Sequence, residues 1–256
     1  MLDKYIRTIR LDVQYDGTQY VGWQRQAKGS SIQSKLEEAL SKVANENVVL
    51  FVAGRTDTGV HARKQMVSMS LVNSKTPIEA FVFGTNALLP PDIRVTASYE
   101  ERIDFRLIQR VKSKTYRYYF RYSPIENVFL KTVWQTKSKF QLSKMKKALR
   151  YLVGEHDFSC FQTHGRETKT GIRKIYKAII RKDREGVYFL EIEANGFLRH
   201  MVRSIMGTIM DVGVGKIEPR VVRSIVASKD RKKAGQTAPP HALFLWEVQL
   251  KSFLNV

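Results

Sequence analysis

The sequence is poor in residues that build cross-linked, metal-held or membrane-embedded structures. Among 256 residues it has one cysteine, Cys160, which excludes an intramolecular disulfide and a cysteine-based zinc site. No segment approaches the roughly 18 to 20 consecutive apolar residues of a membrane-spanning helix. Asp3, Lys4, Arg7 and Arg10 stand where a signal peptide would need its apolar core. We therefore expect a cytoplasmic protein that does not insert into a membrane.

Acidic residues are also scarce, and the shortage is confined to one part of the chain. The sequence has 44 Lys and Arg against 24 Asp and Glu, a formal net charge of +20. Residues 1–105 hold 13 basic and 12 acidic residues, whereas residues 106–256 hold 31 and 12. A near-neutral half joined to a strongly basic half predicts a polyanion that binds mainly to the second. Because the basic residues are scattered over several elements, nucleic acid is favoured over anionic membrane.

The first half reads as the split pattern β-α-β-β-α-β. Alternating apolar residues predict a strand over 9–15, and a capping box at Ser30–Gln33 predicts the helix that follows it. A second capping box at 76–79, with proline at the first helical position, predicts a helix to about Leu89. The remaining strands are expected at 48–52, 65–72 and 93–99.

The second half repeats this pattern approximately. Strands are predicted at 115–122, 173–182, 187–194 and 243–250, and helices at about 142–152, 197–210 and after Pro219. The fold class is therefore α+β, with two ferredoxin-like or RRM-like halves and mostly antiparallel sheets. We expect the halves, 1–105 and 106–256, to meet at a central catalytic cleft, since sites favour such junctions.

The nine residues Gly54–Ala62, GRTDTGVHA, are the strongest local indication of chemistry. They follow a short apolar run, so Arg55 and Asp57 are expected on a tight loop at a strand end, where function concentrates. A carboxylate beside an arginine and between glycines suits a catalytic acid, base or nucleophile. The alternative is an Asx-turn, in which Asp57 only bonds to its own backbone.

Aromatic and basic residues alternate in the predicted strand 114–122. Such interleaving suits RNA, because rings stack on bases while cations hold phosphates. Tyr118, Phe120 and Tyr122 fall on one face and are expected in the core. Tyr116 lies at the start of the strand, where its hydroxyl is expected to reach a cleft.

The predicted helix 197–210 places two arginines one turn apart. Arg199 is expected to be solvated. Arg203 follows an apolar pair and is expected to point inward, where a buried guanidinium needs a carboxylate partner. Asp57 is the candidate, and such a pair would keep its carboxylate ionised and oriented.

Three residues spaced by four imitate a metal site: His156, Cys160 and His164. The segment is polar and irregular and no fourth ligand is evident, so we expect no metal here. His61, His200 and His241 are expected to be structural or surface residues.

In combination, the motifs resemble a family. The chain is similar to the tRNA pseudouridine(38–40) synthases, the TruA-type branch of the pseudouridine synthases, over nearly its whole length. The motifs that carry the resemblance are Tyr15–Thr18, Gly22–Gln26, Ser31–Gln33 with Leu36–Leu40, Gly54–Ala62, Asn86 with Leu89-Pro90, Lys114–Tyr118, Gly154–Phe158, Phe197 with Met201–Arg203, and Thr237–Pro239. There are two departures: Ile108 stands where the family usually has arginine, and Ala242 replaces a usual glycine.

The resemblance implies a reaction and its residues. It implies conversion of uridine to pseudouridine in the anticodon stem-loop of tRNA, at positions 38–40, by a homodimer without cofactor or metal. Asp57 falls on the catalytic aspartate and Tyr116 on the active-site tyrosine, while Arg203 would hold Asp57 and Arg55 would fill the space left by an extruded base. Ile108 and Ala242 bear on substrate choice rather than chemistry.

Further RNA contacts and other functions remain open at this point. The basic residues expected to contact RNA are Lys112, Lys114, Arg199, Arg231 and Lys232. The alternatives are a non-catalytic tRNA-binding chaperone, a pseudouridine synthase with a shifted RNA target, and a metal-dependent ribonuclease. The last would need clustered carboxylates, and only Asp57 is well placed for that role.

Overall fold

The computed structural model describes residues 6–72, 74–163, 170–184 and 186–252. The chain forms two compact units, Met1–Lys112 with Leu245–Val256, and Ser113–Phe244. Most of the last strand, residues 245–250, therefore belongs to the first unit, whereas the division predicted at residue 105 placed it in the second. The reason is long-range pairing: this strand bonds to a strand of the first unit. No helix in the described residues has the length and apolar character to cross a membrane.

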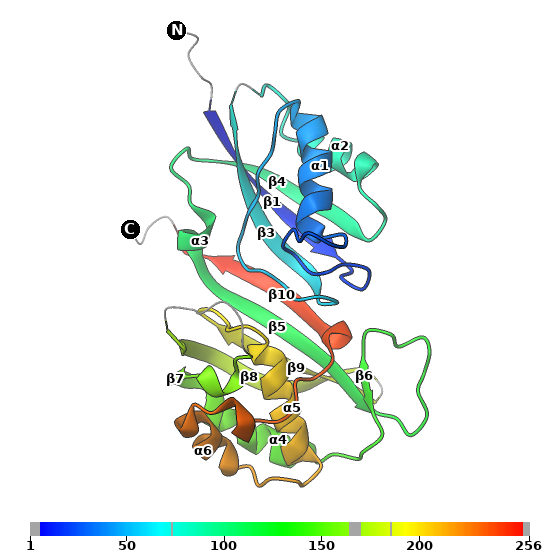
Figure 1. Cartoon of the computed structure of the whole chain (residues 1–256), viewed down its shortest axis with the longest axis vertical. Helices are drawn as coiled ribbons and strands as arrows, with labels where there is room; N and C mark the ends of the chain where they lie inside the picture. The colour runs from blue at the N-terminus through cyan, green and yellow to red at the C-terminus, as the bar shows by residue number, and fades with distance from the viewer. Residues whose placement is uncertain (1–5, 73, 164–169, 185, 253–256) are drawn as a thin grey trace. The chain divides into compact units, whose positions relative to one another are not determined.

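The first unit is a sheet with helices on one face (Figure 1). Its strands lie in the order β4-β1-β3-β10, with the short β2 antiparallel to β3. The helices α1 and α2 pack against each other and cover the sheet. The elements are β1 (Ile6–Tyr15), α1 (Ile32–Ala44), β2 (Phe51–Val52), β3 (His61–Val72), α2 (Ala80–Leu88), β4 (Ile93–Glu101), α3 (Leu107–Arg110) and β10 (Leu243–Leu250).

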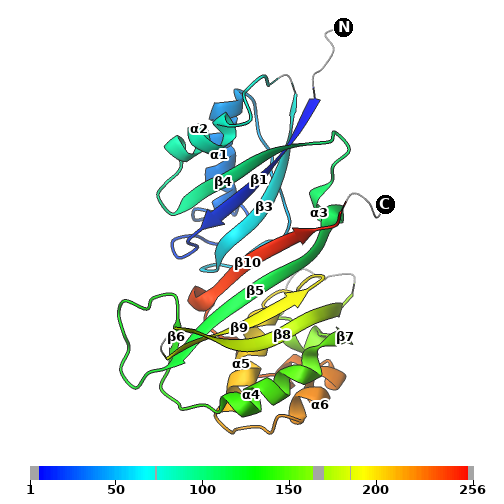
Figure 2. The ribbon, with the colours of Figure 1, turned by 180° about the vertical axis from the view of Figure 1, so that it is seen from behind.

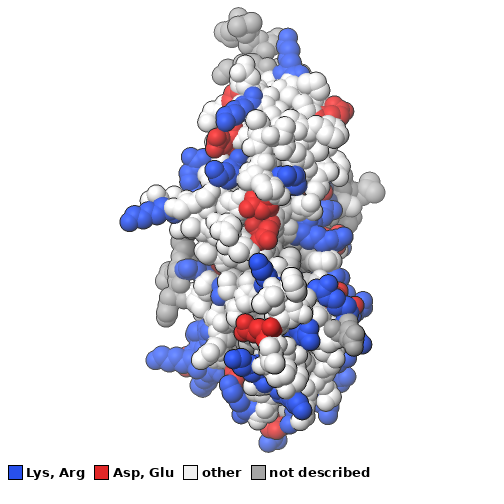
Figure 3. All heavy atoms as spheres, turned by 90° about the vertical axis from the view of Figure 1, so that its right-hand side faces the viewer, with Lys and Arg blue, Asp and Glu red and all other residues white. Residues whose placement is uncertain are grey.

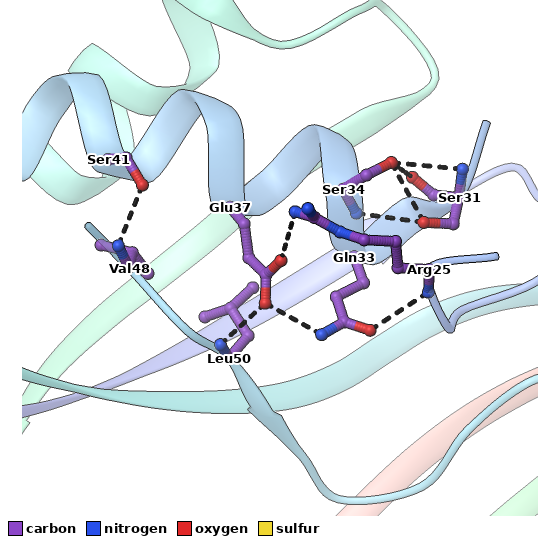
Figure 4. Close-up of polar contacts among 8 residues, drawn as sticks. All are labelled: Arg25, Ser31, Gln33, Ser34, Glu37, Ser41, Val48 and Leu50. Carbon is purple, nitrogen blue, oxygen red and sulfur yellow. Dashed lines mark hydrogen bonds and ion pairs between the residues drawn. The ribbon is translucent and has the colours of Figure 1, made fainter. Parts of the chain in front are cut away.

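The start of α1 is fixed by two serines (Figure 4). Ser31 is the N-cap, and its hydroxyl accepts a bond from the backbone N–H of Ser34 while the Ser34 hydroxyl accepts from the backbone N–H of Ser31. The capping box is therefore shifted by one residue from the predicted Ser30–Gln33. A serine at the third helical position performs the role that glutamine or glutamate usually has.

The strand predicted at 48–52 is only the two residues of β2, for a reason visible in Figure 4. The backbone N–H of Val48 donates to the Ser41 hydroxyl at 3.0 Å, and that of Leu50 donates to the Glu37 carboxylate at 3.0 Å. Side chains of α1 thus take the place of a neighbouring strand. The segment stays extended and buried at Val48 and Leu50 without joining the sheet.

The second unit has the same construction, with its helices behind the sheet in the view of Figure 2. The strand order is β5-β9-β8-β7, antiparallel throughout, and the short β6 is parallel to β5. The elements are β5 (Val111–Tyr122), β6 (Trp134–Thr136), α4 (Leu142–Leu149), β7 (Gly154–Asp157), β8 (Ile172–Arg184), β9 (Val187–Ala194), α5 (Met201–Gly213) and α6 (Val221–Ser228). The predicted α+β class with mostly antiparallel sheets is confirmed.

Two helices begin later than the sequence predicts. The helix α5 begins at Met201 rather than at Phe197, because His200 adopts a left-handed conformation with φ of 59°. Arg199 consequently lies in the loop before the helix, not one helical turn from Arg203. Residues 77–80 form a turn, closed by a bond from the Ala80 N–H to the Pro77 carbonyl at 3.1 Å, and α2 begins at Ala80 without a side-chain cap.

Candidate active site and RNA-binding residues

The loop that carries Asp57 connects β2 to β3 and is tied down at several points. The backbone N–H of Trp23 donates to the Thr56 carbonyl at 3.0 Å, and the Thr56 hydroxyl bonds to the phenol of Tyr15 at 2.8 Å. Gln65 Nε2 donates to the Gly54 carbonyl at 2.7 Å. Trp23 and Gln65 are both at most 1% exposed. Buried partners therefore hold the loop on both sides of Arg55.

Close backbone packing holds the far end of the same loop. The Asp57 carbonyl accepts a bond from the Val60 N–H at 3.1 Å, which closes a turn that has Gly59 at φ of 73°. A side chain on Gly17 would collide with the Val60 carbonyl. Asp57 is half-buried and Arg55 is exposed. The sequence prediction of a tight, glycine-dependent loop at the end of a strand is confirmed.

Tyr116 lies on β5 and presents its ring among aromatic neighbours. It is 8% exposed, it pairs with Ile192 of β9, and it meets the ring of Phe197 edge to face at 5.0 Å. Tyr118 and Phe120, on the same face of the strand, are fully buried, as predicted. Tyr122, which we also expected in the core, is only half-buried.

Arg203 lies in the first turn of α5 and is half-buried. Its Nε donates to the Ala238 carbonyl at 2.8 Å, and the Ala238 N–H donates to the Arg203 carbonyl at 3.1 Å. The phenol of Tyr118 donates to the neighbouring Pro239 carbonyl at 2.8 Å. Burial raises the pKa of Tyr118, an effect that the positive charge of Arg203 partly offsets. The segment 237–239 is thus bound to both α5 and β5.

The predicted site residues divide between the two units. Arg55 and Asp57 belong to the first unit, and Tyr116 and Arg203 belong to the second. Within the second unit, the structure connects the strand of Tyr116 to Arg203 through Tyr118 and the segment 237–239. The ion pair between Asp57 and Arg203 stays a prediction.

The five residues predicted to contact RNA all lie in exposed or half-exposed positions. Lys112, Arg199 and Lys232 are exposed, and Lys114 is half-buried. Figure 3 shows lysine and arginine side chains gathered over the elements of the second unit, with few acidic ones between them. The second unit, residues 113–244, has 27 Lys and Arg against 11 Asp and Glu.

Arg231 is the least suited of the five, because its guanidinium is engaged inside its own loop. Nη1 donates to the carbonyls of Ala234 and Gly235, at 3.3 and 2.9 Å, and Nη2 donates to the Thr237 hydroxyl at 2.9 Å. These bonds shape the segment that leads to Ala238. A role for Arg231 in RNA binding stays a prediction.

The three residues whose spacing resembles that of metal ligands are His156, Cys160 and His164. Cys160 is buried, and burial raises the pKa of its thiol to about 12. His156 lies edge to face with Phe158, and His164 falls outside the described residues. Among the residues that the structure describes, no three His, Cys, Asp or Glu side chains gather as metal ligands.

Tyr15 and Phe197 lie in motifs of the family resemblance, but sequence reasoning assigned them no supporting role, and it did not single out Gln65. Phe197 read as a helical residue, although its ring packs on Tyr116 from a loop. Tyr15 and Gln65 fall within strand patterns, and only their three-dimensional partners show that they hold the loop of Asp57. The one signal that sequence reasoning could have used is that Gln65 falls on the same alternation as Val67 and Met69, which places an amide on the buried face, where it needs hydrogen-bond partners.

A carboxylate on a rigid loop, an aromatic ring on a cation-rich strand and a basic unit are typical of an enzyme that acts on a base of RNA. Comparison with known proteins defines the class. The family model described as tRNA pseudouridine synthase matches residues 12–107 and 148–250.

Individual relatives match over nearly the full length of the chain. Proteins named tRNA pseudouridine synthase A from Caldicellulosiruptor saccharolyticus and Pelobacter propionicus are each 39% identical, and one from a Thermoanaerobacter species is 40% identical. Each match covers 95% of this chain and 99% of the relative. The chain belongs to the tRNA pseudouridine synthase family.

One solved structure matches this chain much more weakly than these relatives do. An H/ACA RNP bound to a substrate RNA containing 2′-deoxyuridine matches with a TM-score of 0.37 and 14% identity, over 80% of this chain and 44% of that chain. This weak similarity gives no information about the site.

Proposed function

We propose that this chain converts uridine to pseudouridine in the anticodon stem-loop of tRNA, at positions 38–40, just 3′ of the anticodon. The enzyme is an isomerase, consistent with its family and with the names of its relatives. The observation that carries the proposal is the Gly54–Ala62 loop, whose Asp57 is held between buried anchors in a chain related to these enzymes over nearly its whole length.

The reaction breaks the N1–C1′ bond of uridine, turns the uracil, and joins C5 to C1′. The target nucleotide must leave its stack, which costs a few kcal/mol. Arg55, exposed on the loop, fills the vacated space. Asp57 acts at the sugar in one of two ways: it attacks C1′, or it removes the C2′ proton to give a glycal. Either route uses an ionised carboxylate close to the positive charge that develops at C1′.

The second unit supplies the groups that act around the base and the carboxylate. Tyr116 stacks on the uracil and helps the C5 proton leave after the new bond has formed. Arg203 holds Asp57 by a charge-assisted pair, and its bond to the Ala238 carbonyl fixes the plane of its guanidinium. We expect no cofactor and no metal, because every step is a proton transfer or a C–N or C–C bond exchange.

The remaining parts of the proposal concern partners. The tRNA phosphates contact Lys112, Lys114, Arg199 and Lys232, and Arg231 is the weakest candidate of the five because its guanidinium is engaged in its own loop. The active form is a homodimer in which one tRNA spans both subunits. Light scattering at working concentration tests the dimer, and a monomer would contradict it. The cytoplasmic location expected from the sequence stays a prediction.

The decisive experiment incubates unmodified tRNA that has uridines just 3′ of the anticodon with wild type and with Asp57→Ala, without added metal. Pseudouridines are then mapped by carbodiimide primer extension. New stops at these positions with wild type alone identify the reaction, the region and the catalytic residue. Asp104→Asn is the control, because this exposed carboxylate pairs only with its neighbour Arg102 among the described contacts.

Binding of tRNA separates the proposal from its alternatives. Asp57→Ala is expected to keep its affinity, because phosphate contacts supply most of it. Loss of folding or of binding together with activity would make Asp57 structural. Absence of stops with intact, salt-sensitive binding favours the chaperone, and stops elsewhere favour a shifted target.

A further inference from the structure

Lys114 lies on the same face of β5 as Tyr116, two residues before it in the strand. Residues two apart on a strand point to the same side and lie about 6.6 Å apart. That spacing is close to the length of one nucleotide of an RNA backbone. A phosphate held by Lys114 would therefore belong to the nucleotide whose base lies on Tyr116, or to its immediate neighbour.

A second cation shares this face from across the sheet. Lys114 pairs with Ala194 of β9, and Ala194 pairs with Ile175 of β8, so these three side chains lie in one row. Arg173 precedes Ile175 by two residues and so points to the same side. The proximity has an electrostatic effect: burial, and then the positive charge of Arg173, lower the pKa of Lys114 to about 8.

The neighbouring carboxylates do not serve these two cations. Glu193 accepts a bond from the Ser113 hydroxyl at 2.7 Å, and Glu191 pairs with Arg117 and Lys177 at 2.7 Å each. Ser113 and Arg117 alternate with Lys114, so both carboxylates serve the opposite face. Within the described parts of the chain, no carboxylate lies at ion-pair distance from Lys114.

Arg173 is half-buried, and hydrogen bonds to its own strand and to the segment just before it hold its guanidinium. Its Nη1 donates to the carbonyls of Thr170 and Ile172, at 2.9 and 2.6 Å, which fixes the side chain in place. Gly196 lies beside it, and a methyl group there would be 3.6 Å from Nε. The next residue, Phe197, contacts Tyr116 at 5.0 Å between ring centres. Gly196, beside Arg173, and Phe197, beside Tyr116, are consecutive in the chain and so link the two cations to the two aromatic rings.

We propose that Lys114 and Arg173 form a subsite for one backbone phosphate of the substrate RNA, at or next to the nucleotide whose base contacts Tyr116. Two cations held together without a carboxylate repel each other, and the singly charged phosphodiester between them, with its two non-bridging oxygens, relieves that repulsion. The proposal rests on the proposed function and adds to it a fixed point for the target strand. It assigns Arg173 to RNA binding and gives Lys114 one particular phosphate.

The test combines protein variants with neutralised phosphates. Anticodon stem-loop RNAs are made with a methylphosphonate in place of one phosphate at a time, on either side of the target uridine. Dissociation constants and single-turnover rates are measured for wild type, Lys114→Met and Arg173→Gln. Lys174→Gln is the matched control, because Lys174 is exposed and adjacent to Arg173 but alternates to the opposite face.

At one phosphate, wild type is expected to lose affinity by about tenfold or more, typical of a charged hydrogen bond. Lys114→Met and Arg173→Gln are expected to bind the normal RNA about as weakly as wild type binds the neutralised RNA. Neutralising that phosphate should then reduce the affinity of either variant little further. This non-additivity shows that the cation and the phosphate interact. Arg173→Lys is expected to restore part of the affinity.

Additive losses at every phosphate would overturn the subsite, because the two cations would then act only through general attraction or through structure. Lys174→Gln with the same non-additivity would also overturn it. The binding measurement does not require turnover. A wild type that forms no pseudouridine would therefore contradict the proposed reaction while the affinities still decide the subsite.

Discussion

Tyr116 combines an aromatic surface with a hydroxyl, and single substitutions separate the two. Its ring is held edge to face by Phe197, so Tyr116→Phe keeps the packing and removes only the hydroxyl. If stacking on the uracil dominates, Tyr116→Phe should reduce the turnover rate much less than Tyr116→Ala, which also loses base stacking worth about 1 to 3 kcal/mol. Single-turnover rates on tRNA test this. Equal losses would assign the role of Tyr116 to its hydroxyl.

Lys114 should lower the stability of the folded protein near neutral pH. Burial and the positive charge of Arg173 lower its pKa to about 8 in the folded chain, against 10.5 for an ordinary lysine. The unfolded state therefore binds more protons between these values, and the contribution of Lys114 to the free energy of unfolding rises with pH through that window. Lys114→Met should consequently be more stable than wild type at pH 7, with a gain that shrinks toward pH 10.5. Urea unfolding at several pH values measures this difference.

The proposed anion subsite would give a functional role to a lysine that lowers stability. A gain in stability for Lys114→Met combined with weaker RNA binding is the trade-off expected of a functional position. A variant that is less stable than wild type at pH 7 would show that the stem of Lys114 contributes more by packing than its charge costs.

At the scale of elements, several long strands were predictable, whereas the starts of α2 and α5 were not. The strands Val187–Ala194 and Leu243–Leu250 have the bounds that their residue patterns predict, because alternation over eight residues is a strong local signal. The start of α5 depends instead on the left-handed His200, whose ring bonds to the Thr163 hydroxyl at 2.6 Å. That contact spans 37 positions and leaves no local trace in the sequence.

The same contrast applies to the candidate site. Asp57 was singled out from the sequence by the glycines and the arginine of one short motif together with the family resemblance, and its catalytic role stays a prediction. Arg173 was not singled out, because it becomes a neighbour of Lys114 only through the register of three strands. Residues whose role depends on strand pairing become visible only when the register is known.

The loop of Asp57 also depends on an element packed against it, through Gly17. A methyl group at this position would collide with the Val60 carbonyl, which is fixed backbone. Gly17→Ala should therefore displace the loop, lower the melting temperature and reduce the turnover rate more than the affinity for tRNA. Gly84→Ala is the control, since its nearest neighbour would be a Val43 methyl group at 3.3 Å, and alanine favours the helix α2. Melting curves and single-turnover rates compare the two; equal effects would contradict a specific role for Gly17.

At the scale of the whole molecule, charge is divided unevenly between the units. The second unit has 27 basic and 11 acidic residues, and the first has 17 and 13. If RNA is held mainly by the second unit, affinity for tRNA should fall steeply between about 50 and 200 mM salt, because each phosphate contact releases counterions. The exposed Lys232 should contribute one contact, so Lys232→Gln should reduce the slope of log K against log salt by about 1.

An exposed lysine of the first unit provides the matched control for this prediction. Lys75→Gln lowers the net charge of the chain by one unit, as Lys232→Gln does, and both lysines are exposed. Dissociation constants of both variants, measured over the same salt series, separate a local contact from the effect of net charge. Equal reductions in slope would mean that tRNA responds to the total charge of the chain. A reduction for Lys232→Gln alone would place a phosphate on the second unit, where the acidic residues are scarce.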